Sequence, residues 1–213
     1  MMIFFIKQEG KMEAQILLWI QNNLRNPVLD AIMKFITSLG DGGYLWMAVI
    51  LVLLIIPKTR KTGLLCLISF LLTFVVNNLA LKNIVNRTRP YVAIPELVPI
   101  TRLPHDASFP SGHTAISFSV AMVMILTMKK RYGIPALVLA SLIAISRPYV
   151  GVHYPSDVLG GFIVSSLIAF GTVECSKLID KKLIGKKNKK LTVENEDKKL
   201  SEENLQTEKE SEK

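Results

Sequence analysis

Five stretches of the chain lack Asp, Glu, Lys and Arg and are rich in Leu, Ile, Val and Phe. They cover residues 42–57, 62–81, 107–128, 132–146 and 158–173. A helix that is apolar on every side needs lipid or a large core around it, and a membrane span needs about 20 apolar residues. Three of the stretches are shorter than that, so they must recruit flanking residues or lie in a thinned bilayer. We predict an all-α, polytopic transmembrane helical bundle with about five spans.

Composition agrees with lipid as the solvent for these stretches. Hydrophobic residues make up 50% of the 213 positions, more than one soluble domain of this size usually needs. A soluble bundle of buried helices is the alternative, but five such stretches leave too little amphipathic surface to cover them. The two cysteines, Cys66 and Cys175, lie far apart in or beside apolar runs, so they favour packing over a disulfide framework or a cysteine zinc site.

The basic residues predict an orientation in the membrane. The net charge is +9, and the Lys and Arg residues gather in short clusters at 58–61, 129–131 and 177–190. Clusters between apolar runs do not form the continuous basic face that nucleic acid requires, so we expect no nucleic-acid partner. With five spans the three clusters share one side, which the positive-inside rule makes cytoplasmic. The loop at 82–109 and the loop after Arg147 then face the extracytoplasmic side.

The amino-terminal segment, residues 1–41, differs from the apolar stretches that follow it. Residues 14–20 and 28–39 have the pattern of amphipathic helices, broken at Asn26 and Pro27. Such helices lie in the membrane interface or dip into it without spanning.

Two further segments complete the predicted organisation. Residues 42–176 form the transmembrane domain. Residues 177–213 begin with Lys and continue with Glu, Lys, Asn and Ser, a composition typical of a disordered tail. We expect this tail to be cytoplasmic, with its basic start near anionic headgroups.

Polar residues of the two outward loops form three clusters. The first contains Lys82 and Arg89, which are seven residues apart. On a continuous helix this spacing places them on one face, where both can bind one tetrahedral anion. A juxtamembrane basic cluster that binds lipid headgroups is the alternative interpretation.

The second cluster is Ser111, Gly112 and His113, at the start of the third apolar stretch. Backbone N–H groups and a hydroxyl at a helix amino terminus form an anion site. A histidine there can donate and recover a proton near neutral pH. A helix cap with an ordinary interfacial histidine is the alternative.

The third cluster bridges the fourth and fifth stretches and contains Arg147, His153 and Asp157. Arg147 offers a planar fork that suits phosphoryl oxygens. Asp157 follows His153 by four residues and can hold one ring nitrogen, which fixes the tautomer. A capping arrangement would have the same appearance.

Together the clusters resemble the type 2 phosphatidic acid phosphatase superfamily, over residues 82–157. The family pattern is Lys, six residues, Arg-Pro; then Pro-Ser-Gly-His; then Ser-Arg, five residues, His, three residues, Asp, and every position is matched. A three-part match with fixed internal spacing is far more specific than any one part. The resemblance implies that the phosphoryl oxygens are bound by Lys82, Arg89, Arg147, Ser111 and the Gly112 N–H group.

The resemblance also implies a catalytic sequence. His153 attacks phosphorus and forms a phosphohistidine, and Asp157 orients it. His113 protonates the leaving group and then activates the water. Phosphoryl transfer depends mainly on positioning and on charge neutralisation, and three fixed cations can provide both without a metal or another cofactor.

Two alternative chemistries share these residues. His113, His153 and Asp157 have the ligand types of a two-histidine, one-carboxylate metal site, but three neighbouring cations would repel a divalent metal. The superfamily also includes soluble vanadate haloperoxidases, and the five predicted spans argue against that activity.

The expected substrate is a lipid phosphate or diphosphate whose chain stays in the bilayer. The chain looks like the bacterial undecaprenyl diphosphatases of the superfamily, although phosphatidylglycerophosphate or phosphatidate would fit the same site. A non-catalytic lipid-phosphate binder or transporter is a further alternative. It would need only the cations, whereas both histidines stand where catalysis requires them.

Several polar residues fall outside the family pattern. We interpret Arg87, Arg102 and His105 as solvated or interfacial loop residues. Asn77 and Asn78, within the second stretch, suit hydrogen bonding between helices, with contact to the substrate as the alternative. No pattern in the sequence indicates the oligomeric state.

Overall fold

The computed structural model describes the backbone of residues 2–211 and the side chains of residues 11–183. Over this backbone the chain contains helices and loops but no strand. It divides into two compact units, Met1–Val173 and Glu174–Lys213.

The first unit is built from helices of very different length. They are α1 Met2–Asn23, α2 Pro27–Ser38, α3 Tyr44–Ile55, α4 Arg60–Thr73, α5 Lys82–Val85, α6 Pro90–Ala93, α7 Gly112–Thr127, α8 Lys130–Tyr149 and the first part of α9 Pro155–Ser211. Two short 3-10 helices, η1 Asp41–Gly43 and η2 Pro57–Thr59, flank α3, and a π-helix, η3 Phe74–Leu81, joins α4 to α5.

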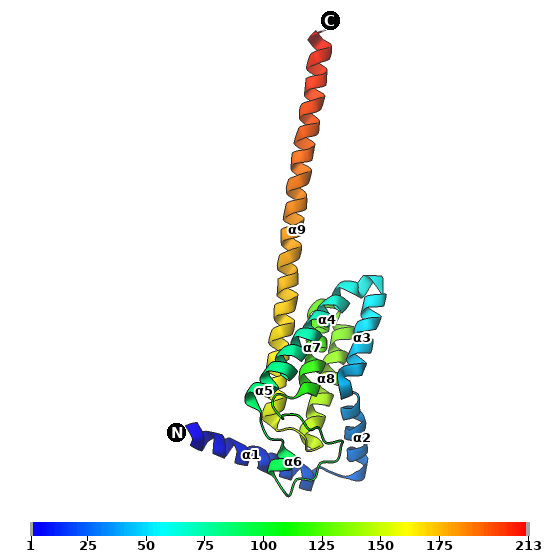
Figure 1. Cartoon of the computed structure of the whole chain (residues 1–213). Helices are drawn as coiled ribbons and strands as arrows, with labels where there is room; N and C mark the ends of the chain where they lie inside the picture. The colour runs from blue at the N-terminus through cyan, green and yellow to red at the C-terminus, as the bar shows by residue number, and fades with distance from the viewer. Residues whose placement is uncertain (1, 212–213) are drawn as a thin grey trace. The chain divides into compact units, whose positions relative to one another are not determined.

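Helix α7 lies at the centre of this unit. It packs against α8 and α4, while α4 packs against α3 and α8 packs against α2 (Figure 1). The first turns of α9 also reach α7, where the rings of Phe118 and Phe162 meet edge to face at 4.8 Å between centroids. The Nε1 of Trp46 donates a hydrogen bond of 2.9 Å to Ser117 Oγ inside the core. The core therefore surrounds the helix that the sequence placed third among its spans.

The all-α membrane prediction is confirmed, but the count of five spans is not. Within the part of the chain that the structure describes, three helical stretches are long and apolar enough to cross a membrane: Pro57–Ala93, Lys130–Tyr149 and Pro155–Leu183. Pro27–Ser38 and Asp41–Ile55, bent by 42°, make a fourth if they count as one span. The remaining stretch, Gly112–Thr127, is apolar but short.

The third stretch is shorter than predicted because of its capping chemistry. Residues 107–111 form a loop, and α7 begins only at Gly112, after Ser111 has accepted a hydrogen bond from the Thr114 N–H group. A Ser side chain that binds the first-turn N–H groups fixes a helix start. The predicted start at Ala107 is therefore wrong by five residues.

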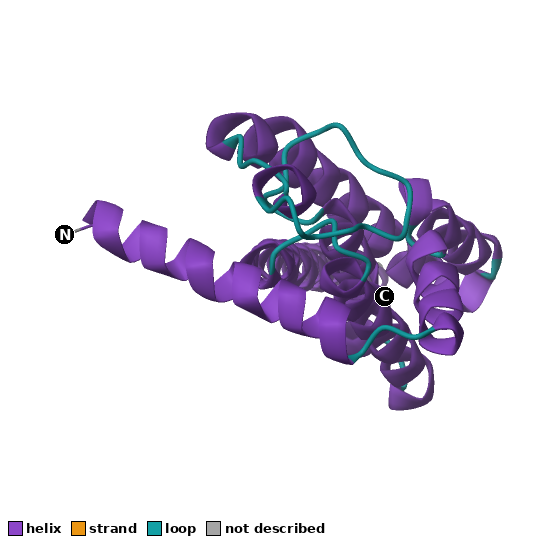
Figure 2. Ribbon diagram, turned by 90° about the horizontal axis from the view of Figure 1, so that it is seen from below, coloured by secondary structure: helices purple, strands orange, loops and turns teal. Residues whose placement is uncertain are grey.

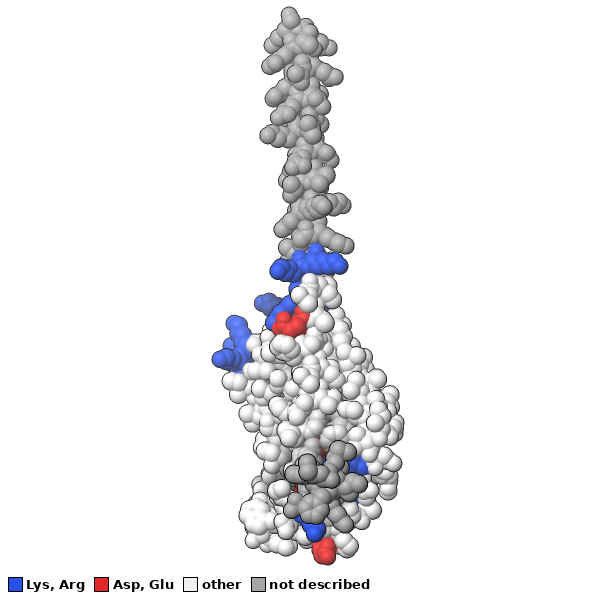
Figure 3. Space-filling model, turned by 90° about the vertical axis from the view of Figure 1, so that its left-hand side faces the viewer, with Lys and Arg blue, Asp and Glu red and all other residues white. Residues whose placement is uncertain are grey.

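The surface of the first unit has an uncharged zone between charged ends. In Figure 3 the middle of the visible face shows neither Lys and Arg nor Asp and Glu, and charged side chains appear above and below it. Leu51, Leu72 and Leu167 are among the large apolar side chains exposed on the helices. Such a zone is what a bilayer covers.

The amino-terminal helices break where the sequence predicts. Helix α1 ends at Asn23 and α2 begins at Pro27, and Asn26 caps α2 by accepting a hydrogen bond from the Leu29 N–H group at 3.0 Å. Figure 2 shows α1 lying across one end of the unit, beside the loops. Trp19 and Phe35 are exposed, and their interfacial location in the membrane stays a prediction.

In the second unit, Glu174–Lys213, the backbone of α9 is helical to Ser211. This differs from the disorder predicted for residues 177–213, because Glu, Lys and Leu favour helix locally even without a core to pack against. The side chains from residue 184 onward lie outside the described part, and the disorder of this tail in solution stays a prediction.

Candidate active site

The three sequence clusters meet at one cavity of about 450 Å³ in the first unit. Its polar walls come from Asn78, Lys82, Arg89, Asp106, Gly112, His113, Arg147 and His153. Apolar walls come from α3, α4, η3 and α7, through Met47, Phe70, Leu71, Phe74 and Ile116. Segments more than a hundred residues apart in sequence therefore build a single site.

Lys82 and Arg89 reach the cavity by a route that the sequence did not predict. The helix that carries Lys82 ends at Val85, because Asn86 adopts a left-handed conformation with φ 44°. Asn tolerates this conformation better than most residues, and Arg89 precedes a proline, which disfavours helix. The continuous two-turn helix predicted here is wrong.

The two cations nevertheless share one acidic partner, Asp106. Its Oδ1 accepts a hydrogen bond of 2.8 Å from Arg89 Nη2, and its Oδ2 pairs with Lys82 Nζ. Desolvation acts to raise the pKa of Asp106, but the contacts with Lys82 and Arg89 together outweigh it and lower that pKa to about 2. The carboxylate therefore bridges two of the cations that we expect to bind a phosphoryl group.

Arg147, the third cation, is almost completely buried, with 2% of its surface exposed. Its Nη1 donates to Thr37 Oγ1 of α2. Its Nε is buried and has no hydrogen-bond partner among the described residues. A buried charged donor without an acceptor is costly, so the site is suited to an anion that would accept this hydrogen bond.

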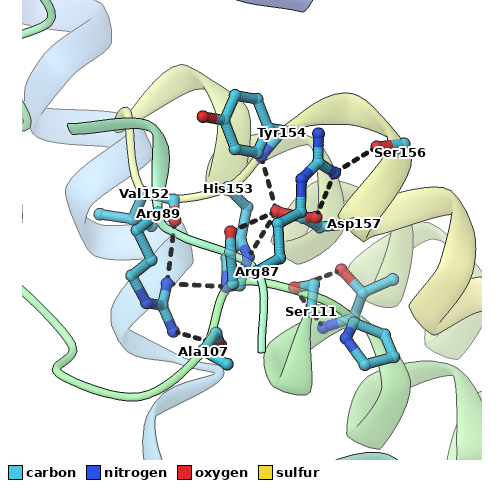
Figure 4. A network of polar contacts seen from close by, with 12 residues as sticks. Arg87, Arg89, Ala107, Ser111, Val152, His153, Tyr154, Ser156 and Asp157 are labelled. Atoms are coloured by element: carbon cyan, nitrogen blue, oxygen red, sulfur yellow. Dashed lines mark hydrogen bonds and ion pairs between the residues drawn. The ribbon is translucent and has the colours of Figure 1, made fainter. Parts of the chain in front are cut away.

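His153 lies between Arg89 and Asp157 (Figure 4). Its Nδ1 is 3.3 Å from Asp157 Oδ2, and its Nε2 is 3.2 Å from Arg89 Nη1. Because Asp157 only accepts and Arg89 only donates, these partners select the tautomer with the proton on Nδ1. Burial lowers the pKa of His153 to about 3. The ring is therefore neutral, and its Nε2 carries the unprotonated lone pair that a nucleophile needs.

Asp157 is completely buried and is held by several donors. Its Oδ2 accepts hydrogen bonds from the Tyr154 N–H group at 2.9 Å and from Ser108 Oγ at 2.5 Å. Its Oδ1 accepts one of 2.7 Å from Arg87 Nη1. These contacts fix the carboxylate in front of the His153 ring.

His113 is the second residue of α7, and its Nε2 lies 2.8 Å from Asp41 Oδ1. Gly112 lines the cavity, and a Cβ there would lie 3.3 Å from Asn78 Oδ1 and 3.8 Å from Lys82 Nζ. The absence of a side chain at Gly112 thus leaves its backbone accessible to a ligand. Ser111 is fully buried, and its hydroxyl caps α7 behind the cavity wall.

Sequence reasoning missed three acidic residues and misjudged one cation. Asp41 contacts His113 and Asp106 contacts Lys82, but neither residue belongs to a motif. Arg87, interpreted as a loop residue, forms a salt bridge with Asp157 and another with Glu13 of α1. Of these residues, Asp106 is the one that the sequence could have indicated as a partner of the nearby cations, because it is the single acidic residue of the stretch 97–111. Arg102 and His105 are exposed in this loop, as expected.

The asparagines of η3 contact the same region. Asn77 Nδ2 donates to Asn78 Oδ1 at 2.9 Å and reaches the Pro110 carbonyl at 3.5 Å. Over the described residues, no group of three His, Cys, Asp or Glu side chains is placed to hold a metal ion. Metal-independent catalysis stays a prediction.

Comparisons with known proteins agree with this geometry. The sequence profile of the PAP2 superfamily matches residues 62–180. An undecaprenyl-diphosphatase of Sulfolobus acidocaldarius is 35% identical over 146 residues, which cover 68% of this chain and 70% of the relative. An undecaprenyl-diphosphatase of Bacillus subtilis is 35% identical over 147 residues, with coverage of 68% and 74%.

A solved structure shares the fold. The crystal structure of a transmembrane PAP2-type phosphatidylglycerolphosphate phosphatase from Bacillus subtilis superposes with a TM-score of 0.65 at 29% identity. The match covers 82% of this chain and 87% of that structure.

Proposed function

The chain belongs to the PAP2 superfamily and is a membrane phosphatase, and on this premise we propose that it converts undecaprenyl diphosphate to undecaprenyl phosphate. The observation that carries the chemistry is the buried, neutral His153, whose Nε2 borders a cavity walled by Lys82, Arg89 and Arg147. Hydrolysis of a lipid phosphomonoester or diphosphate by a phosphohistidine route follows from this arrangement.

In the first step the terminal phosphoryl group replaces Asp106 as the partner of Lys82 and Arg89. Nε2 of His153 attacks phosphorus, and the bond from phosphorus to the leaving oxygen breaks. That oxygen takes a proton from His113, while Asp157 holds the Nδ1–H group of the attacking ring. Fixed cations stabilise the charge that spreads over the phosphoryl oxygens.

In the second step water attacks the phosphorus of the phosphohistidine. His113, which has lost its proton, accepts one from this water. The bond from phosphorus to Nε2 breaks, inorganic phosphate leaves, and both histidines return to their starting states. Asp106 can then pair again with Lys82 and Arg89.

The apolar part of the cavity supports a lipid substrate. Met47, Leu71 and Phe74 line the cavity and are also 41%, 53% and 42% exposed. These side chains make an apolar path from the polar centre to the uncharged outer surface. A headgroup can enter along it while its chain remains in the bilayer.

The topology supports an extracytoplasmic site. Helix α4 runs from the basic turn at 58–61 toward the Lys82 end, and α7 runs from Gly112 toward the basic turn at 129–131. Both basic turns therefore lie at the helix ends remote from the cavity. By the positive-inside rule those ends are cytoplasmic.

The test is phosphate release by the purified, detergent-solubilised protein in the presence of a metal chelator. Undecaprenyl diphosphate, phosphatidylglycerophosphate and phosphatidate are assayed in parallel, with His153→Ala as the blank and Arg102→Ala as the matched surface control. We expect undecaprenyl diphosphate to be hydrolysed fastest, the blank to be inactive and the control to be unchanged. Preference for another lipid would reassign the substrate. Binding without turnover would favour the binder or transporter interpretation.

A further inference from the structure

Arg87 contacts the group that orients the nucleophile, although the mechanism above does not use it. Its Nη1 donates a hydrogen bond of 2.7 Å to Asp157 Oδ1 and one of 2.6 Å to Ser156 Oγ. Its guanidinium carbon lies 4.0 Å from the centroid of the Tyr154 ring. Figure 4 shows Arg87 reaching Asp157 from the side opposite Arg89. A buried carboxylate needs a cation or several donors to stay ionised, and Arg87 supplies the cation.

Glu13 of α1 extends this contact into the amino-terminal segment. Its Oε2 pairs with Arg87 Nη2, and its Oε1 accepts a hydrogen bond of 2.9 Å from the Ser156 N–H group. Ser156 is the second residue of α9, where N–H groups lack partners within the helix. Glu13 therefore binds Arg87 and the start of α9 at once.

Apolar contacts hold α1 in this place. Leu17, one turn after Glu13, is completely buried in a cluster with Ile94, Leu97 and Tyr154. Tyr154 follows the nucleophile directly in sequence. The position of the Glu13 carboxylate is thus set by packing next to the catalytic loop.

We propose that Glu13 and Arg87 are positioning residues for the pair His153 and Asp157, so that α1 is part of the catalytic apparatus. The proposal rests on the proposed function, in which His153 attacks phosphorus. Arg87 holds Asp157 Oδ1, which keeps Oδ2 aimed at the ring of His153. Glu13 holds the guanidinium of Arg87 and offsets part of its charge.

This arrangement predicts charge effects of opposite sign at His153. The charged groups that face His153 are Asp157 of α9, Arg147 of α8 and Arg89 before α6. Arg87 cancels part of the field of Asp157. Arg87→Gln therefore raises the pKa of His153, whereas Glu13→Gln leaves the charge of Arg87 uncompensated and lowers it. A residue that only stabilises the fold would not give this pair of shifts.

The experiment uses the full-length protein in detergent, with steady-state kinetics on undecaprenyl diphosphate and NMR of ¹⁵N-labelled histidine. The chain has three histidines, so His153→Gln identifies the His153 signals. We expect Arg87→Gln to lower kcat about 10- to 100-fold, the range found when a partner that orients a histidine is removed. KM should stay nearly constant, and the His153 titration midpoint should rise. Glu13→Gln should lower that midpoint, and His105 should not respond.

Gln21→Leu is the matched control on the same helix. Gln21 donates to the Glu96 carbonyl at 2.9 Å and accepts from the Val98 N–H group. Its replacement therefore weakens the attachment of α1 at a point that does not contact Asp157. We expect kcat and the His153 midpoint to be unchanged. If Arg87→Gln misfolds, Arg87→Lys keeps the charge and should preserve the midpoint with a reduced kcat.

Two results would overturn the proposal. One is a folded Arg87→Gln protein with wild-type kcat and midpoint. The other is an equal loss of kcat in Gln21→Leu. A wild-type protein that hydrolyses no lipid phosphate would instead refute the proposed function, and the histidine titration would still decide whether the network acts on His153.

Discussion

Asp106 supplies the counter-charge for two of the three cations in the cavity. Its two oxygens pair with Lys82 and Arg89, much as two phosphoryl oxygens would. Its side chain is 53% exposed, so a competing anion can displace it. We infer that this carboxylate competes with phosphate for the cations and favours product release.

Asp106→Asn should therefore strengthen inhibition by inorganic phosphate. We expect the inhibition constant to fall roughly three- to tenfold, a modest effect because the pair is partly exposed to solvent. The measurement is phosphate inhibition of lipid hydrolysis, with Glu96→Gln in the same loop as control. An unchanged inhibition constant would show that Asp106 does not compete with phosphate.

The burial of His153 predicts how stability depends on pH. Its pKa of about 3 in the folded protein lies below the ordinary value of 6.5. Between these values the unfolded state binds more protons, so stability is complete above pH 6.5 and falls as the pH falls toward 3. Tm measured from pH 7 to 4.5 should decline less in His153→Gln than in the wild type. Parallel curves would contradict the assignment.

At the same scale, the sequence predicted the residues of the motifs but not their partners. The three cations, both histidines and Gly112 line the cavity as grouped by the sequence, with Asp157 directly behind His153. The sequence did not predict the contacts of Asp41, Asp106 and Glu13. In each contact the two residues are far apart along the chain, by 24 to 143 positions. Pairing over such separations follows from helix packing, which no local pattern contains.

Among the elements, the break between α2 and α3 is the one that touches the chemistry. Gly42 and Gly43 have φ of 58° and 69°, a conformation that glycine adopts without strain. A Cβ on Gly40 would lie 2.6 Å from His113 Cδ2 and 2.9 Å from Ile143 Cγ2. The break therefore leaves room for the ring of the expected general acid.

Gly40→Ala should displace His113 and lower kcat. A displacement near 1 Å costs on the order of 100-fold in rate, so we expect a loss of roughly 10- to 100-fold. Gly171→Ala is the control, because no atom lies within 4 Å of a Cβ at Gly171. Turnover assays with thermal unfolding compare the two. Wild-type kcat in Gly40→Ala would show that the ring tolerates the contact.

Helix existence was easier to predict than helix limits. Long uncharged stretches identified α4, α8 and α9, because lipid or core packing requires apolar surface on all sides. The limits of α3 and α7 depend on single residues, Gly43 and Ser111. Because these cap residues start α3 and α7 later than the apolar stretches begin, both helices are shorter than the stretches. The length of an apolar stretch therefore did not predict five full spans.

For the whole molecule, the distribution of charge predicts sidedness. The basic turns at 58–61 and 129–131 lie at the ends of α4 and α7 remote from the cavity, and the loop with His105 lies at the cavity end. If the positive-inside rule holds for this chain, a membrane-impermeant thiol reagent on intact cells should label His105→Cys but not Lys130→Cys. Lys130→Cys should react only after permeabilisation. Cys66 is buried and Cys175 is exposed, so the background is Cys175→Ser. The reverse labelling would place the active site in the cytoplasm and exclude an outer-leaflet substrate.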